Sequence, residues 1–165
     1  MFKKLFVLPL ALLFLFVCGC AAKPKSKPIL NNISFIAEID YGDNKFVCDT
    51  AISENVLKLT VTEPDEIQDL NLTISQTEVE TEFKGVSYTK SLDELASGSV
   101  AKIFHSLLND ILDNKSASYN DENCEITGKA EGFKYVFVFS PSGLPISLCV
   151  DELDLKIVFK NASII

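Results

Sequence analysis

The chain has 165 residues, 47% of them hydrophobic, and a formal net charge of −8. All 23 acidic residues lie after residue 30, and five of the 15 basic residues precede it, so residues 31–165 carry a net charge of −13. So acidic a segment excludes a nucleic-acid-binding surface. Every basic residue is a lysine, which also excludes the bidentate clamps on phosphate that only arginine provides.

The N-terminus has the organisation of a secretory signal peptide. Lys3 and Lys4 form a short basic segment, and residues 5–17 are uncharged and strongly hydrophobic. A basic segment followed by such an apolar core predicts export across the cytoplasmic membrane. We assign residues 1–19 to the signal peptide.

The end of this segment, Val17-Cys18-Gly19-Cys20, resembles the bacterial lipobox. The resemblance implies that Cys20 is the lipid attachment site, whereas Cys18 fits poorly because bulky Val17 precedes it. It also implies that N-terminal acyl chains, such as palmitate, anchor the protein on the extracytoplasmic face of the cell membrane. An uncleaved membrane helix over residues 5–22 is the alternative, since 18 apolar residues are just enough to cross a bilayer.

Residues 20–30 combine the acylated cysteine with a linker. Lys23, Lys25 and Lys27 alternate with Pro24 and Pro28 at close spacing. Proline stiffens such a segment, so we expect a semi-extended spacer. The remaining residues 31–165 are enough for one ordinary domain.

The first half of this domain predicts antiparallel strands. Apolar residues alternate with polar ones over residues 33–41, and the turn composition Gly42-Asp43-Asn44 predicts a hairpin with residues 45–50. Similar alternation predicts strands at residues 56–62, 70–74 and 79–83. A short helical turn is expected at residues 91–95.

One amphipathic helix is predicted at residues 99–114. Its apolar residues recur at helical spacing and form a continuous stripe. They are Val100, Ile103, Phe104, Leu107, Leu108, Ile111 and Leu112. Lys102, Ser106, Asn109, Asp110 and Asp113 are expected on the opposite face, and Ser99 is positioned to cap the first turn.

Strands resume after a polar loop at residues 114–123. We expect them near Cys124 and Ile126, over residues 133–139, over 146–150 and over 153–159. The predicted fold is α+β: a curved antiparallel half-barrel of about nine strands, packed on one long amphipathic helix.

Three cysteines lie in the predicted domain: Cys48, Cys124 and Cys149. Export permits a disulfide, but an odd number would leave one thiol free. We favour three small residues packed within strands. Their spacing does not predict a zinc site.

The strand at residues 133–139 carries four aromatic residues on one face: Phe133, Tyr135, Phe137 and Phe139. If the helix does not fill the curved sheet, these rings and Phe104 would line an apolar cavity for a lipid or another hydrophobic molecule. The alternative is that the rings simply pack against the helix.

Catalytic residues are not evident in the sequence. His105 is the only histidine and lies near the polar face of the helix, and no nucleophile-elbow motif is present. We therefore expect no enzyme, no cofactor and no metal site. A non-enzymatic interaction or structural lipoprotein of the cell envelope, with a closed core, is the alternative to a hydrophobic-ligand-binding protein.

The lipobox, the expected sheet and helix, and the turn Gly143-Leu144-Pro145 together resemble the LolA/LppX-type superfamily. The resemblance implies a half-barrel over residues 31–165 and the carriage of lipids or acyl chains across the envelope. The chain departs from the lipoprotein carrier itself in being lipidated and in lacking the arginine near its cavity.

Overall fold

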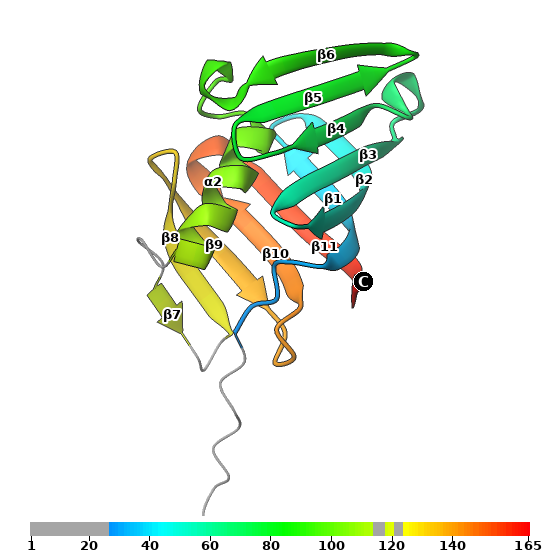
Figure 1. Ribbon diagram of the computed structural model, residues 1–165. Coiled ribbons are helices and arrows are strands. Elements are labelled where there is room, and N and C mark those ends of the chain that lie inside the picture. The colour runs from blue at the N-terminus through cyan, green and yellow to red at the C-terminus, as the bar shows by residue number, and fades with distance from the viewer. Residues whose placement is uncertain (1–26, 114–117, 121–123) are drawn as a thin grey trace, which may run out of the picture.

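The computed structural model describes residues 27–113, 118–120 and 124–165. They form a mostly β structure in which the helix α2 (Val100–Asp113) lies across one face of an eleven-stranded antiparallel sheet (Figure 1). The sheet is neither closed nor strongly curled. The predicted antiparallel sheet with one amphipathic helix is confirmed.

The sheet is built from two runs of neighbouring strands. The first run comprises β1 (Ile33–Tyr41), β2 (Asn44–Ser53), β3 (Val56–Glu63), β4 (Asn71–Ile74), β5 (Glu78–Phe83) and β6 (Val86–Ser91). The second comprises β7 (Ser118–Asn120), β8 (Glu125–Ala130), β9 (Phe133–Phe139), β10 (Pro145–Val150) and β11 (Leu155–Ile164). Short 3-10 turns occupy Asp65–Ile67 (η1), Leu92–Glu94 (η2) and Asp151–Leu153 (η3).

The first and last strands pair at the middle of the sheet. The spatial order is β6-β5-β4-β3-β2-β1-β11-β10-β9-β8-β7, and β1 is antiparallel to β11. Each run therefore extends outward from this central pair. The helix α2 (Val100–Asp113) comes between β6 and β7 in sequence, so it connects the two opposite edges across one face.

Burial of α2 follows the predicted stripe with two differences. Its start is capped as expected, because the Lys102 amide donates to Ser99 Oγ at 3.4 Å. Ile103, Phe104, Leu107, Leu108 and Ile111 are buried. Leu112, however, is 49% exposed, whereas Asp110, expected on the polar face, is only 6% exposed.

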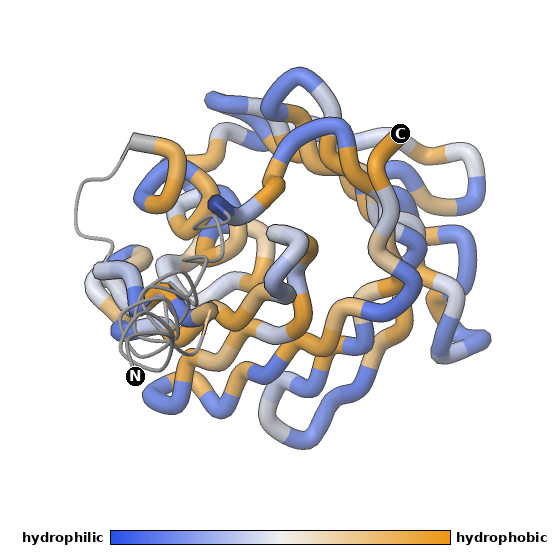
Figure 2. The backbone as a smooth tube through the Cα atoms, turned by 90° about the horizontal axis from the view of Figure 1, so that it is seen from below, coloured by the Kyte–Doolittle hydropathy of each residue, from blue (hydrophilic) through white to orange (hydrophobic). Residues whose placement is uncertain are grey.

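Aromatic contacts join the helix to both halves of the sheet. The Phe159 ring on β11 lies edge-on to Phe35 at 4.9 Å, and it also contacts Phe104 and Phe137, each at 6.1 Å between centroids. Such contacts stabilise a core by roughly 1 kcal/mol each beyond their buried area. Along the strands, hydrophobic residues alternate with hydrophilic ones, as the colours of the backbone tube show in Figure 2. This alternation places the hydrophobic residues on one face of the sheet.

The expected strand number and curvature were wrong in detail. Two edge strands, β6 and β7, were not predicted. Most of β6 is exposed, and all three residues of β7 are, so neither has the buried-exposed alternation on which the prediction depended. The strong curvature expected of a half-barrel is not present either, since the sheet is not strongly curled.

The chain enters the domain at the turn between β9 and β10. The Ile29 amide donates to the Gly143 carbonyl oxygen at 2.7 Å, and Gly143 has a φ of 89°. A β-carbon at Gly143 would lie 2.5 Å from the Lys27 carbonyl oxygen. The glycine of the Gly143-Leu144-Pro145 turn is thus required both by its backbone conformation and by the close approach of the linker.

The predicted signal peptide and Cys20 lie outside the described residues. Within the described part, no helix is long and apolar enough to cross a membrane. All three cysteines of the domain are free, as favoured; Cys48 is buried in β2 and Cys149 is half-buried in β10. Cys124 is half-buried in the turn before β8, so the prediction that it lies within a strand was wrong.

Candidate functional site

An apolar cavity of about 170 Å³ lies between α2 and the half of the sheet formed by β1–β4. Strand residues contribute most of its lining, and α2 contributes one side. The lining residues are Phe35, Ala37, Ile39, Phe46, Cys48, Thr50, Leu59, Val61, Ile67, Leu70, Leu72, Val100, Ala101, Phe104 and Ile157. None of them carries a charge.

Small side chains at paired positions explain why this space is not filled. Ala37 on β1 is the register partner of Cys48 on β2, and Thr50 is the next inward residue of β2. Across from them, the helix presents Ala101. Because the neighbouring inward positions hold large residues such as Phe35, the small ones leave a void rather than drawing the layers together.

The cavity has a buried floor and a half-exposed rim. Floor residues on β1, β2 and β3 are buried, including Ala37, Cys48 and Leu59. Rim residues are half-exposed: Phe46, Ile67, Leu70, Leu72, Val100 and Ala101. The mouth therefore lies between the first turn of α2 and the segment that contains η1 and leads into β4.

Two weakly polar groups face the otherwise hydrocarbon floor. The Thr50 hydroxyl reaches the Cys48 carbonyl oxygen only at 3.5 Å, a long distance for a hydrogen bond. Burial, with a smaller contribution from the negative charge of Asp49, raises the pKa of the Cys48 thiol to about 11. The thiol is therefore neutral at physiological pH, and the cavity offers no ionised group.

The predicted ligand-lining residues are divided between this cavity and the closed core. Phe104 lines the cavity. Tyr135, Phe137 and Phe139 on β9 are at most 3% exposed within the core, and Phe133 is half-buried against it. The rings of Phe137 and Phe139 stack at 6.4 Å, and none of the four β9 aromatics lines the cavity.

The cavity is therefore on the opposite half of the sheet from the one that the aromatic strand indicated. Large rings fill space, and the void forms instead where small inward residues meet. The signal in the sequence was the occurrence of Ala37, Cys48 and Thr50 at inward positions of two neighbouring strands, among larger apolar residues.

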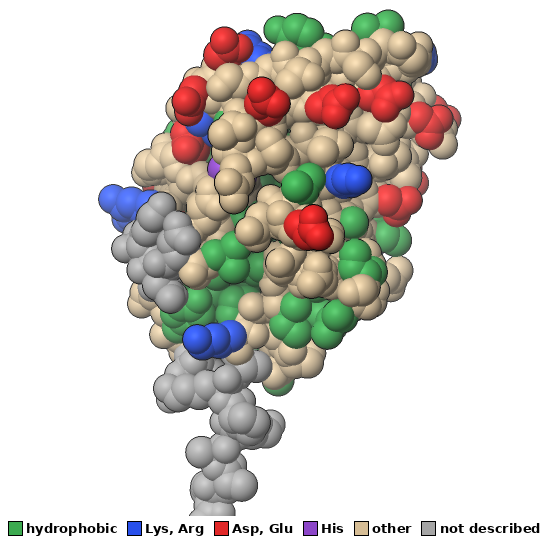
Figure 3. Space-filling model, in the orientation of Figure 1, with side chains coloured by type: hydrophobic (Ala, Val, Ile, Leu, Met, Phe, Trp, Pro, Cys, Tyr) green, Lys and Arg blue, Asp and Glu red, His purple; other side chains and the backbone are tan. Residues whose placement is uncertain are grey.

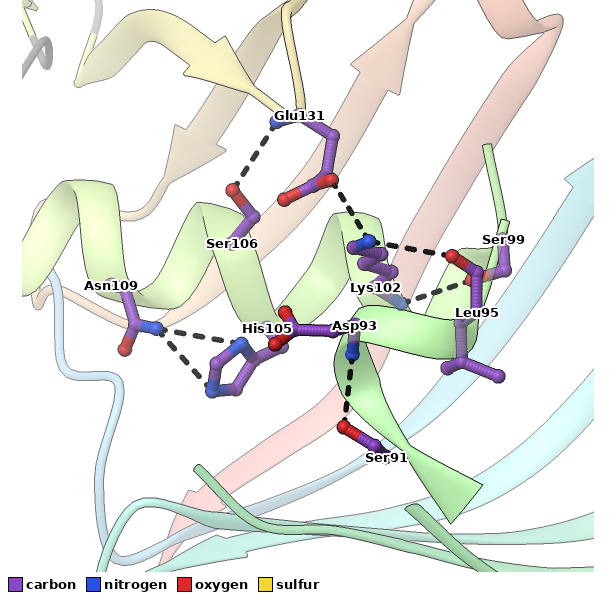
Figure 4. Close-up of polar contacts among 9 residues, drawn as sticks. All are labelled: Ser91, Asp93, Leu95, Ser99, Lys102, His105, Ser106, Asn109 and Glu131. Carbon is purple, nitrogen blue, oxygen red and sulfur yellow. Dashed lines mark hydrogen bonds and ion pairs between the residues drawn. The ribbon is translucent and has the colours of Figure 1, made fainter. Parts of the chain in front are cut away.

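A second, polar cleft of about 300 Å³ lies on the other side of α2. Its contacts are drawn in Figure 4: Lys102 Nζ lies 3.5 Å from Glu131 Oε2 and donates to the Leu95 carbonyl oxygen at 3.3 Å. Ser106 Oγ accepts from the Glu131 amide at 3.2 Å. These groups bind one another and fix α2 to the β8–β9 turn.

His105 also faces this cleft. Its ring nitrogens lie 3.3–3.4 Å from Asn109 Nδ2, one helical turn away (Figure 4). Burial lowers the pKa of His105, and the negative charge of Glu131 opposes that shift. Among the described residues, no group of three metal-ligating side chains is placed to hold a metal ion.

Asp110 forms a buried hydrogen bond to Tyr135 beneath this cleft. The Tyr135 hydroxyl donates to Asp110 Oδ2 at 2.7 Å, and Gly128 on β8 gives the pair its space. A β-carbon at Gly128 would lie 2.5 Å from both oxygens. Burial, followed by the bond to Asp110, raises the pKa of Tyr135, so the tyrosine remains a donor.

Comparison of the chain with protein-family models and with curated proteins finds no match.

The Tyr135 hydroxyl is expected to stabilise the fold measurably. Tyr135→Phe removes one donor from the buried carboxylate of Asp110, so the free energy of unfolding should fall by roughly 1–3 kcal/mol. Tyr88→Phe is the control, because Tyr88 lies on the outer strand β6 and is 63% exposed. Urea unfolding of both variants measures the difference, and equal effects would contradict the assignment.

The Cys48 thiol should make stability fall at alkaline pH. Its folded-state pKa of about 11 lies above the ordinary value of 9.0, so its contribution is complete below about pH 9 and is lost as the pH rises through about 11. Two pKa units correspond to about 3 kcal/mol. Urea unfolding over this pH range should show that the free energy of unfolding falls less in Cys48→Ala than in the parent. Cys149→Ala keeps Cys48, so its free energy of unfolding should fall as much as that of the parent.

Proposed function

We propose that the chain is a membrane-anchored extracytoplasmic lipoprotein whose domain binds a small hydrophobic group in the apolar cavity beneath the first turn of α2. The observation that carries this proposal is the cavity itself, about 170 Å³ in volume and lined without a single charged residue. Apolar pockets with few polar groups are the usual sites for hydrophobic ligands.

The volume limits what the cavity can hold. An engineered apolar cavity of about 150 Å³ in another protein binds benzene, whereas sites for drug-sized ligands begin at about 300 Å³. A cavity of about 170 Å³ therefore suits a small apolar molecule or the end of one hydrocarbon chain. The half-exposed rim would let the rest of a longer ligand remain outside.

An occupant would also offset an energetic cost. The apolar side chains that line the cavity lack packing partners on that side. A ligand that filled the space would restore those dispersion contacts.

Filling the mouth should block binding. Ala101→Leu adds three carbon atoms to the rim and keeps a residue that favours helix, so the variant should fold and lose affinity for benzene by at least about tenfold. Ala51→Leu is the matched control, since Ala51 lies between the buried residues Thr50 and Ile52 and faces the other side of the sheet.

The measurement is methyl NMR of the full chain in phospholipid nanodiscs during benzene titration. The Ala37 and Leu59 methyl groups on the cavity floor should shift, and the Ala130 methyl on β8, away from the cavity, should not. An absence of any shift at the floor in the parent chain would refute the proposed binding function.

Anchoring through Cys20 is the second part of the proposal. It is supported by the lipobox-like sequence and by the linker, which meets the domain at Gly143. Kinship with the LolA/LppX-type superfamily, and with it the carriage of acyl chains, remains a proposal; an antiparallel sheet with one helix across its face supports it.

The two candidate cysteines provide a direct test of the anchor. Cys20→Ser should abolish incorporation of labelled palmitate and release the protein from the membrane fraction, whereas Cys18→Ser should do neither. Labelling and fractionation of cells that express each variant measure the outcome. Unchanged labelling of Cys20→Ser would exclude Cys20 as the acylated residue.

An interaction module is the second candidate function. The outer strand β6 forms one edge of the sheet, and Val86 and Tyr88 on it are 71% and 63% exposed. An edge with unpaired backbone groups and exposed apolar side chains can accept a strand from a partner. This surface would carry the function if the cavity takes no ligand.

A further inference from the structure

We infer that the cavity selects ligands whose polar end is uncharged or cationic and rejects fatty-acid anions of the same chain length. This inference rests on the proposed function, because it concerns the ligand class of the same cavity. It follows from the charges that surround the mouth, since a bound chain longer than the cavity must leave its polar end there.

The segment between β3 and β4 makes one side of the mouth strongly acidic. Ile67 and Leu70 line the cavity, and the exposed residues Asp65, Glu66 and Asp69 are within two positions of one of them. Neighbouring Cα atoms are about 3.8 Å apart, so the Cα atoms of these acidic residues lie within about 8 Å of those of the rim residues, a distance comparable to the Debye length at physiological ionic strength. Residues 61–72 contain no lysine.

Acidic side chains are also visible over the upper part of the molecule in Figure 3, while hydrophobic side chains gather lower on the same face. The charges of the β3–β4 segment thus add to a surplus of negative charge over residues 31–165 as a whole. A carboxylate held at the mouth would be repelled, whereas an ammonium group would be attracted.

The two lysines next to rim residues already have partners. Lys45, adjacent to Phe46, lies 3.3 Å from Asp40 Oδ1. Lys102, adjacent to Ala101, turns to the opposite side of the helix and pairs with Glu131 at 3.5 Å (Figure 4). Neither is directed to neutralise an anionic ligand at the mouth.

The N-terminus of α2 is the feature that opposes this selection. Its dipole is equivalent to roughly half a positive charge, and Val100 and Ala101 in its first turn line the cavity. The Ser99 side chain already accepts from the Lys102 amide. Asp65, Glu66 and Asp69, between β3 and β4, carry three full negative charges. These outweigh the partial positive charge that remains at the N-terminus of α2.

The inner surface does not favour an anion either. Thr50 and Cys48 are the polar lining residues, and neither is ionised at physiological pH. A carboxylate drawn inward would lose its hydration without gaining a counter-charge. An alcohol or an amine at the mouth keeps its contact with water.

The test compares three probes that share one six-carbon chain: 1-hexanol, hexylammonium and hexanoate. Full-length protein in nanodiscs of zwitterionic phosphatidylcholine is titrated with each at neutral pH and low salt, and the Ala37 and Leu59 methyl signals are followed. We expect hexylammonium to bind at least about tenfold more tightly than hexanoate, with hexanol between them, and the difference to shrink as salt screens the mouth.

Two triple variants test whether the acidic residues at the mouth cause the selection by charge. Asp65→Asn, Glu66→Gln and Asp69→Asn together should bring the affinities of the two ions to within about threefold of each other and leave hexanol unchanged. Asparagine tolerates the positive φ of 66° at position 69. The control replaces Glu78, Glu80 and Glu82 by Gln, which removes the same charge from the exposed outer positions of β5 and should preserve the selection.

The outcomes separate the two proposals. If none of the probes shifts the floor methyl groups, the hydrophobic-ligand function fails. If hexanoate binds as tightly as hexylammonium while all three bind, the function stands and the acidic-mouth inference is overturned. Equal loss of selection in both triple variants would also overturn it, because the overall charge rather than the mouth would then be responsible.

Discussion

The helix α2 must cover the apolar face of a sheet that is much wider than the helix. Eleven strands at about 4.8 Å spacing span about 50 Å, whereas the 14 residues of α2 extend about 21 Å. Phe159 lies at the centre of this contact, with Phe104 of the helix and Phe35 and Phe137 of the two strand runs around its ring. The cavity and the polar cleft both lie along the helix, so its placement determines their shape.

The two sides of α2 pack against the sheet in different ways. On the β8–β9 side, polar groups bind one another: Lys102 and Ser106 hold Glu131, and Asp110 accepts from Tyr135. On the β1–β4 side, small apolar residues leave a void. Satisfied polar networks rigidify an interface, so the polar side holds the helix in place while the apolar side stays unfilled. Such a division fits a binding protein in which the ligand need not move the helix.

The sequence predicted what depended on periodicity and missed what depended on tertiary contacts. The stripe of α2 and the alternation in β1 predicted both elements because burial on one face fixes the pattern. The edge strands β6 and β7 have no such face. The four aromatics of β9 correctly indicated a large apolar surface but not whether it was filled, and the cavity on the other half depends on which small residues become register partners, such as Ala37 and Cys48.

Charge has two consequences in this molecule, and they act at different places. The basic linker meets the domain beside the β9–β10 turn, at the bottom of Figure 1, whereas η1 and its acidic neighbours lie between β3 and β4 near the top. If Cys20 anchors the chain, the lysines of the linker are the groups nearest to an anionic bilayer, to which they are attracted. The acidic residues that repel such a surface are then carried away from it, where they keep the domain soluble and set the potential at the cavity mouth. One acidic surface can therefore serve solubility and ligand selection without weakening the anchor.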